Sequence, residues 1–298
     1  MTFGVDFAST TVVGVVESYE DVRGDVVRGY GSGTLVTLGD RHFVVTAGHT
    51  IEGRSVDEIF IAFPSRLALA WKTGEHVERV WCSKEPDVAV IELNEKAKRD
   101  WIGTMQMRPM PATAIGSSAE VEEGSEVWIV GYPTKMQSTA LVESELARQQ
   151  GEPGRVVEKV TRNGGILGRT KATWKVPNPH AADGATVLHA RYDAGAYTEN
   201  PETGAPHKIV DPHGASGGPV LRMVDRAFRL CAIVRSQHEH KPYLWCDDVT
   251  GAIALLREHE DAGVRADVER ICDDDRVSAD GQRSPGLTRR RTAPPEGR

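Results

Sequence analysis

Three side chains in this sequence are of the types that together can activate a hydroxyl group for attack on a carbonyl carbon. His49 follows an apolar run, Asp87 precedes another, and Ser216 lies in the glycine-rich stretch 214–219. A serine hydroxyl is a weak nucleophile at neutral pH unless an imidazole takes its proton, and the imidazole needs an acid partner that holds its tautomer. The three residues therefore predict covalent catalysis, with Ser216 as nucleophile, His49 as base and Asp87 as the acid partner.

The order of these residues and the sequences around them resemble the trypsin-like (chymotrypsin-fold) serine protease family, bacterial intracellular type. The resemblance covers roughly residues 28 to 260 and rests on the segments 31–36, 41–49, 87–93, 130–133 and 214–219. It implies an all-β fold of two six-stranded antiparallel β-barrels with a C-terminal helix. It also implies a serine endopeptidase activity that uses His49, Asp87 and Ser216 as catalytic residues.

The loop around Ser216 also supplies groups that could hold a developing negative charge. The resemblance implies an oxyanion hole made by the backbone N–H groups of Gly214 and Ser216, and a glycine at position 214 permits the unusual dihedral angles this requires. Ala215 departs from the secreted relatives, in which an aspartate before the nucleophile pairs with the N-terminus released by activation cleavage. We therefore expect a loop ordered by its own packing, by substrate or by a regulatory protein partner.

Residues on both sides of the nucleophile loop are candidates for substrate binding. Val210 lies where relatives often set the primary pocket, and a valine there favours a small or apolar side chain. Lys208, Asp211 or His213 could equally face the pocket. Relatives often carry Ser-Trp-Gly where this chain has Arg235, Ser236 and Gln237. A long cation at position 235 could lower the pKa of Asp87 or block a substrate strand, and the sequence leaves both open.

Two other functions remain compatible with the sequence. A catalytically silent protein on the same fold could bind a peptide by strand addition and act as a scaffold, with the three side chains misaligned. An esterase would use the same nucleophile, and turnover of small activated esters but not of peptides would distinguish it. The intact set of His49, Asp87 and Ser216 favours the peptidase, for which we expect a protein or peptide substrate.

The elements that must position these residues are mostly strands. Short β-branched runs bounded by turn residues predict strands at residues 11–16, 33–38, 43–46, 59–63 and 88–93, with a hairpin turn at residues 39–40. Directly after the nucleophile loop, residues 219–223 and 228–234 predict a hairpin that turns at Asp225 and Arg226. Further strand-like runs lie at 124–130, 155–160 and 186–192. Closure of such strands into barrels satisfies their edges.

The C-terminal part of the chain predicts helices. Apolar spacing predicts one helix over residues 250–259 and a second, short one over 264–272, and the polar, arginine-rich remainder from Asp273 predicts disorder. We therefore expect a first barrel at residues 9–108 that carries the histidine and the aspartate. A second barrel with the terminal helix follows at 109–262 and carries the nucleophile, and a tail with a short helix occupies 263–298.

Composition argues against several classes of partner. The 298 residues are 39% hydrophobic and 27% charged, as in an ordinary soluble globular protein long enough for two small barrels. A formal net charge of −7 argues against general binding to nucleic acid or to a membrane surface. The N-terminal residues lack the basic region and apolar stretch of a secretion signal, and no run is apolar enough to span a membrane, so we expect a cytoplasmic protein.

The cysteine and histidine patterns predict neither a metal nor a cofactor. The cysteines lack metal-ligand spacing and are expected to stay thiols in a reducing compartment; they are Cys82, Cys231, Cys246 and Cys272. The run His238-Glu239-His240 could contribute metal ligands, but alternate side chains of a strand point to opposite faces and no third ligand follows at a recognisable spacing.

Overall fold

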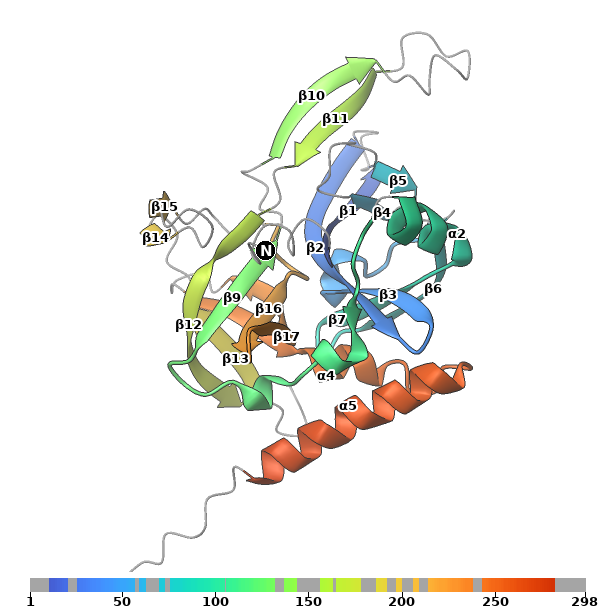
Figure 1. Ribbon diagram of the computed structural model, residues 1–298. Helices are drawn as coiled ribbons and strands as arrows, with labels where there is room; N and C mark the ends of the chain where they lie inside the picture. Colours follow the sequence, from blue (N-terminus) through green and yellow to red (C-terminus); the bar gives the residue numbers. More distant parts are fainter. Residues whose placement is uncertain are drawn as a thin grey trace, which may run out of the picture.

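Strands make up most of the structure, as the β-branched runs predict. The computed structural model describes residues 11–20, 26–56, 59–62, 70–72, 76–104, 106–131, 137–143, 156–162, 165–177, 186–191, 197–199, 206–208, 214–237 and 243–281. Two large sheets lie side by side, and the helices α4 (Val249–Ala254) and α5 (Ala262–Gly281) run below them in the view of Figure 1.

The first sheet has eight strands, and the candidate histidine and aspartate lie just beyond the ends of two neighbouring inner strands, β3 (Arg41–Thr46) and β7 (Val88–Leu93). Its other strands are β1 (Val12–Glu20), β2 (Val26–Leu38), β4 (Ile59–Ala62), β5 (Ala70–Lys72), β6 (Val77–Ser83) and β8 (Met110–Pro111). They follow the order β5-β4-β1-β2-β3-β7-β6 with antiparallel neighbours, and β8 pairs with β2 in parallel. Because β3 pairs with both β2 and β7, it lies inside the sheet, and its last four residues are buried.

The second sheet is a closed barrel. Its strands are β9 (Glu126–Gly131), β12 (Gly165–Pro177), β13 (Thr186–Arg191), β16 (Pro219–Val224), β17 (Ala227–Gln237) and β18 (Tyr243–Asp248). They close in the order β12-β13-β18-β17-β16-β9. The hairpin predicted after the nucleophile loop is β16 and β17, and its turn residues Asp225 and Arg226 both have the positive φ that a tight two-residue hairpin requires.

The expectation of two closed six-stranded barrels is only partly met. Within the described strands, closure is found for the second sheet alone, and the outer strands of the first sheet, β5 and β6, do not pair with each other. The first sheet also has more strands than expected, since β1 and β2 are long enough to hold β4 and β8 as further partners. Alternation in the sequence locates a strand, but it does not tell which edges meet.

Two small ribbons lie outside both sheets. Strands β10 (Gln137–Glu143) and β11 (Val156–Arg162) pair with each other, as do β14 (Tyr197–Glu199) and β15 (Pro206–Lys208). Figure 1 shows the β10–β11 ribbon standing away from the sheets. Both ribbons belong to the long stretch of sequence that separates β9 from the nucleophile loop.

The helices differ in length from the sequence prediction. Helix α4 is shorter than the predicted 250–259, whereas α5 is longer than the predicted 264–272 and continues through residues 273–281, where we expected disorder. Short helical segments connect the strands: η1 (Gly48–Thr50), α2 (Glu95–Ala97), η4 (Lys98–Thr104), η5 (Ala112–Ala114) and η6 (Ser118–Glu120). Within the described residues, no helix combines the length and apolar composition needed to cross a bilayer.

Buried apolar side chains form three clusters. One fills the first sheet, around Leu35, Ile91 and Trp101, and another fills the closed barrel. The third joins both sheets to the two C-terminal helices, and its members include Phe43, Leu221 and, from α5, Val264, Val268 and Ile271. Helix α5 therefore packs on the boundary between the two sheets, which is also where the candidate catalytic residues meet.

Candidate active site

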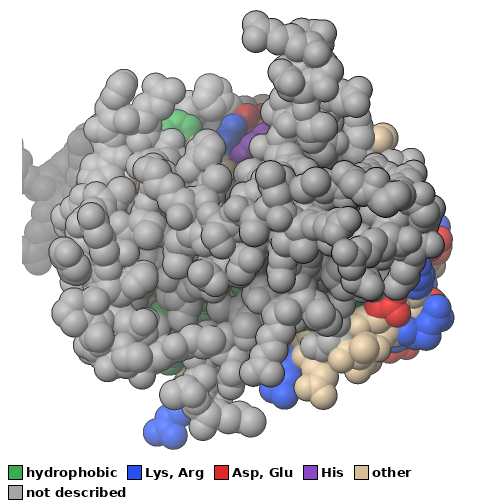
Figure 2. Space-filling view, turned by 90° about the horizontal axis from the view of Figure 1, so that it is seen from above, with side chains coloured by type: hydrophobic (Ala, Val, Ile, Leu, Met, Phe, Trp, Pro, Cys, Tyr) green, Lys and Arg blue, Asp and Glu red, His purple; other side chains and the backbone are tan. Residues whose placement is uncertain are grey.

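His49 lies where β3 ends and the chain enters a single helical turn. The strand ends at Thr46, and η1 covers Gly48–Thr50. The Thr50 hydroxyl donates to the carbonyl oxygen of Ala47 over 2.6 Å and closes this turn. The His49 side chain is 47% exposed, which leaves its ring accessible to a substrate. In the view from above, a histidine reaches the surface beside basic and acidic side chains (Figure 2).

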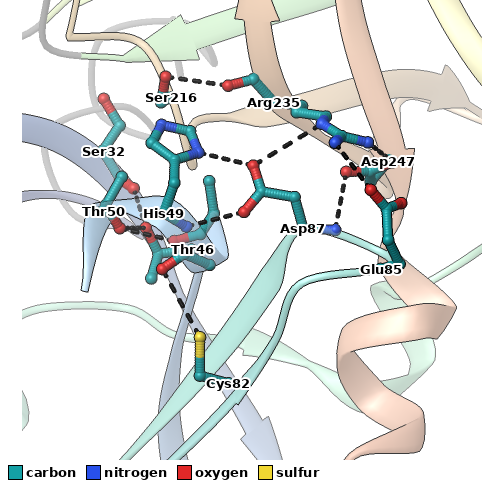
Figure 3. A network of polar contacts seen from close by, with 12 residues as sticks. Ser32, Thr46, His49, Thr50, Cys82, Glu85, Asp87, Ser216, Arg235 and Asp247 are labelled. Atoms are coloured by element: carbon teal, nitrogen blue, oxygen red, sulfur yellow. Dashed lines mark hydrogen bonds and ion pairs between the residues drawn. The ribbon is translucent and has the colours of Figure 1, made fainter. Parts of the chain in front are cut away.

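Asp87 directly precedes β7 and holds His49 at two points. Nδ1 of the His49 ring lies 2.6 Å from Oδ2 of Asp87, and the backbone N–H of His49 donates to Oδ1 over 2.7 Å (Figure 3). The sheet register brings the two together, because Thr46 of β3 lies opposite Ala89 of β7. The carboxylate favours the ring tautomer with its proton on Nδ1, and Nε2 is then free to act as a base.

Asp87 is ionised at neutral pH although its side chain is only 10% exposed. Burial acts to raise the pKa of Asp87, but the hydrogen bonds and charge of His49, followed by the charge of Arg235, outweigh burial and lower that pKa below the ordinary value of 3.8. The carboxylate therefore offers a full negative charge to the imidazole.

The loop that carries Ser216 is held by packing and by backbone hydrogen bonds. Gly217 donates its N–H to the carbonyl oxygen of Val234 over 2.7 Å, and Ala215 is completely buried. Gly214 has a φ of +93° and Gly217 a φ of +84°, a backbone region that favours glycine. Among the described residues, no acceptor is found for the N–H groups of Gly214 and Ser216, so both remain available to a ligand.

Ser32 of β2 connects the first sheet to this loop. Its backbone N–H donates to the carbonyl oxygen of Ser216 over 2.6 Å, and its hydroxyl donates to the carbonyl oxygen of Gly214 over 2.9 Å. Ser32 is completely buried, and its own carbonyl oxygen accepts a bond from the Thr46 hydroxyl over 2.7 Å. Sequence reasoning did not assign a role to Ser32, although its position between two glycines in the segment 31–33 was a signal of close backbone approach.

The Ser216 hydroxyl donates to the backbone carbonyl oxygen of Arg235 over 3.0 Å. Arg235 is the extra residue of a β-bulge, since the pairing of β17 with β18 shifts register between Val234 and Ser236. A bulge bends its strand and changes the direction of the groups on it. Because a hydroxyl has one proton, Ser216 does not donate to His49 in this arrangement, and its side chain must turn before His49 can accept that proton.

The Arg235 guanidinium lies among three carboxylates. Nη2 donates to Oε1 of Glu85 over 3.1 Å, Nε lies 3.8 Å from Oδ2 of Asp87, and Nη1 lies 3.9 Å from Oδ1 of Asp247. Asp247, on β18, also accepts the backbone N–H of Asp87 over 3.2 Å. The cation expected near Asp87 is thus present. Asp247 was not anticipated because β18 was not predicted as a strand, and the sequence analysis assigned no role to Glu85 in the loop before β7.

The other substrate-binding candidates are placed only in part. Val210 and His213 lie outside the described residues. Ser236 is half-buried on β17, and Gln237 ends that strand with a side chain outside the described set. Their roles in substrate binding therefore stay predictions. The run 238–240 also lies outside the described residues, and no group of three or more potential ligand side chains within them could hold a metal ion.

Comparison with models of protein families gives a match that covers most of the chain. A family model for the trypsin-like peptidase domain matches residues 31–233, a span that includes His49, Asp87 and Ser216 and more than half of the chain. No curated protein matches the sequence.

Proposed function

The chain belongs to the trypsin-like peptidase domain family, and from this premise we propose that it is a serine endopeptidase whose catalytic residues are His49, Asp87 and Ser216. The observation that carries the proposal is the double attachment of His49 to Asp87 beside the ends of β3 and β7, next to the loop that presents the Ser216 hydroxyl. Figure 3 draws the His49 imidazole between the side chains of Asp87 and Ser216. The substrate we propose is a peptide or protein chain, and the reaction needs no cofactor.

The reaction begins with a rotation of the Ser216 side chain. The hydroxyl leaves the Arg235 carbonyl oxygen and turns to Nε2 of His49, which takes its proton while Oγ attacks the scissile carbonyl carbon. The imidazolium formed in this step keeps its Nδ1 proton and donates it in a hydrogen bond to the ionised carboxylate of Asp87. The charge of Asp87 thus offsets the charge that appears on His49.

The negative charge on the former carbonyl oxygen needs donors that are already in place. The N–H groups of Gly214 and Ser216 fit this role, because Ser32 holds the carbonyl oxygens of both residues and so fixes the neighbouring peptide planes. One such donor typically contributes about 3 kcal/mol to transition-state stabilisation. His49 then gives its proton to the leaving amine, and the Ser216 acyl ester is hydrolysed by a water that His49 activates in the same way.

The test is labelling with a fluorophosphonate, which reacts with an activated serine and requires no known substrate. We expect the wild type to be labelled, and Ser216→Ala and His49→Ala to lose labelling by at least about a thousandfold. Ser125→Ala is the matched control, since Ser125 lies in a surface turn and its hydroxyl donates only to the Glu122 carbonyl oxygen. Labelling of a folded wild type that is unaffected by both catalytic substitutions contradicts the proposal.

A second measurement separates peptidase from esterase and from a silent binding protein. Digestion of a denatured protein mixture followed by mass spectrometry identifies new peptide termini that require Ser216. Ester turnover without new termini indicates an esterase, and a folded protein that shows neither activity and no labelling indicates a peptide-binding scaffold.

A further inference from the structure

At the bulge, the backbone carbonyl and the side chain of Arg235 contact two different residues of the candidate site. Its carbonyl oxygen faces the Ser216 hydroxyl, and its guanidinium turns back to the carboxylate of Asp87. The side chain is only 18% exposed, because Glu85 and Asp247 enclose its other two nitrogens. The guanidinium is therefore committed to the carboxylates of the protein and does not reach into solvent towards a substrate.

Two buried carboxylates meet at this point, one from each sheet. The side chain of Asp87 is 10% exposed and that of Asp247 is 4% exposed, and the Asp87 backbone N–H donates to Asp247. Two ionised carboxylates in such a place repel each other, and neither is well solvated. Arg235 lies within 4 Å of an oxygen atom of each, so it is the counterion that both share.

The balance of charges shows in the two pKa values. Burial raises the pKa of Asp247 to about 6, with Arg235 acting in the opposite direction and Asp87 adding to the rise. The pKa of Asp87 itself is lowered, as described above, with Arg235 among the causes. Asp87 therefore stays ionised beside a second acid that does not ionise easily.

We propose that Arg235 is a positioning residue for Asp87: from β17 it supplies the positive charge that the carboxylates of Asp87 and Asp247 share and that holds Asp87 oriented towards His49. Asp247 completes the arrangement by accepting the Asp87 backbone N–H. This inference rests on the proposed peptidase function. It assigns to Arg235 a role in the charge of the catalytic groups, in place of the substrate contact that the sequence also allowed.

Charges around Asp87 change the pH at which His49 becomes protonated, and the direction of that change can be measured. Among the described residues, the titratable or charged groups that face Asp87 are His49 from η1, Cys82 from β6, Arg235 from β17, Asp247 from β18 and Glu85 from its own loop. Removing the cation makes the surroundings of His49 more negative, which favours its protonated form. Removing the Asp247 charge has the opposite effect. The pH below which the base becomes protonated therefore moves up in the first case and down in the second.

Three variants test this: Arg235→Met, which keeps an unbranched apolar stem without the charge, Arg235→Lys, which keeps the charge, and Asp247→Asn, which keeps an acceptor for the Asp87 N–H. The rate constant for fluorophosphonate inactivation is measured as a function of pH. For Arg235→Met we expect the acid limb to move up by about 0.5 to 1 pH unit and the plateau rate to fall about tenfold to a hundredfold. For Asp247→Asn we expect a smaller downward shift of the limb, and for Arg235→Lys a limb near that of the wild type.

Opposite shifts in Arg235→Met and Asp247→Asn support the proposal, because structural damage lowers the rate without moving the limb in opposite directions. A fall in rate with no shift in either variant overturns it. Where Arg235→Met does not fold, the double variant with Asp247→Asn removes both charges, and its limb is expected to return close to that of the wild type. If the acid limb of the double variant instead lies about 0.5 to 1 pH unit above that of the wild type, the shift expected for Arg235→Met alone, the proposal is also overturned.

A readout without catalysis keeps this inference separate from the proposed function. The titration of the His49 ring protons is followed by NMR, with His49→Gln for assignment, in the wild type and the same three variants. Absence of inactivation in the wild type contradicts the peptidase proposal alone, since the His49 midpoint still moves up without Arg235 and down without the Asp247 charge. Midpoints that stay within about 0.2 pH units of the wild type overturn the role of Arg235.

Discussion

One buried hydroxyl holds the nucleophile loop to the first sheet. Ser32 donates to the carbonyl oxygen of Gly214 over 2.9 Å, across 182 positions of the chain, and both groups are inaccessible to water. We predict that Ser32→Ala lowers kcat about tenfold or more with little change in KM, because the Gly214 carbonyl is no longer held and the adjacent peptide that carries the Gly214 N–H loses the direction that serves the transition state. Steady-state kinetics on a peptide found by the digestion experiment measures both constants.

The control for this prediction is Ser125→Ala, which removes a similar hydroxyl-to-carbonyl bond in a surface turn. We expect that variant to match the wild type in kcat and in thermal stability. A rise in KM at unchanged kcat in Ser32→Ala assigns Ser32 to substrate binding and contradicts a role in oxyanion stabilisation.

Gly217 and Gly124 have nearly the same positive φ but different surroundings, so substitutions at them distinguish the cost of backbone strain from the cost of a steric clash. Gly217 and Gly124 have φ values of +84° and +81°, but a Cβ at Gly217 would lie 2.0 Å from the Ser32 carbonyl oxygen, whereas one at Gly124 meets nothing within 4 Å. We predict that Gly124→Ala costs about 1 kcal/mol of stability and leaves activity intact. Gly217→Ala is expected to cost several kcal/mol more and to abolish labelling of Ser216. Thermal unfolding and fluorophosphonate labelling decide, and equal costs for the two variants contradict the crowding argument.

Short sequence contexts were enough to predict the candidate catalytic residues but not their supporting partners. His49, Asp87 and Ser216 each lie in a local pattern that names them, and the structure brings His49 and Asp87 into contact. Ser32 and Asp247 act on residues that are 182 and 160 positions away along the chain. Such contacts depend on how the two sheets pack together, which no local pattern encodes.

At the scale of elements, periodicity located strands better than it located their ends or partners. The runs that predicted strands at residues 33–38, 43–46 and 88–93 correspond to β2, β3 and β7, all of which have a buried face. Strand β18 was missed because its six residues mix two aromatic with two acidic side chains. The end of α5 was missed because apolar spacing marks the packed face of a helix, here down to Cys272, and gives no signal beyond it.

Helix α5 is expected to stabilise both sheets at once, because its apolar face lies in the cluster that joins them. Ile271, 3% exposed, belongs to that face. We predict that Ile271→Ala lowers the free energy of unfolding by about 2 to 4 kcal/mol, from lost burial and the cavity left behind. Urea denaturation followed by tryptophan fluorescence measures this change.

The matched control on the same helix is Glu269→Ala, whose side chain is exposed. We expect it to change stability by less than about 0.5 kcal/mol. A destabilisation confined to one of two separate unfolding transitions contradicts a shared role for α5 and indicates that the sheets unfold independently.

At the scale of the whole molecule, each sheet supports a candidate catalytic residue of the other. The first sheet supplies Ser32, which fixes the loop around Ser216, and the second supplies Arg235 and Asp247, which fix Asp87. These polar contacts lie on the same boundary between the sheets as the apolar cluster to which α5 contributes. The relative position of the two sheets therefore sets the geometry of the candidate site, and a change at their boundary affects chemistry and stability together.

Asp247 makes the stability of the whole molecule depend on pH in a direction opposite to that of Asp87, whose pKa is lowered in the folded protein. Burial raises its pKa to about 6, above the ordinary value of 3.8, so the folded protein binds this proton more tightly than the unfolded chain does. The stabilisation from that proton is complete below about pH 4 and is lost as the pH rises through about 6. Asparagine resembles the protonated acid at every pH.

We therefore predict that Asp247→Asn is more stable than the wild type at about pH 8, by up to about 3 kcal/mol, and that the gain disappears as the pH falls towards about 4. Urea denaturation of both proteins across this range measures the difference. Asp225→Asn, at the exposed turn between β16 and β17, is the control for removal of one negative charge and is expected to show no such pH dependence. A gain that is the same at every pH would mean that the asparagine only packs better. A loss at about pH 8 would mean that the attraction between Asp247 and Arg235 exceeds the cost of burying the charge.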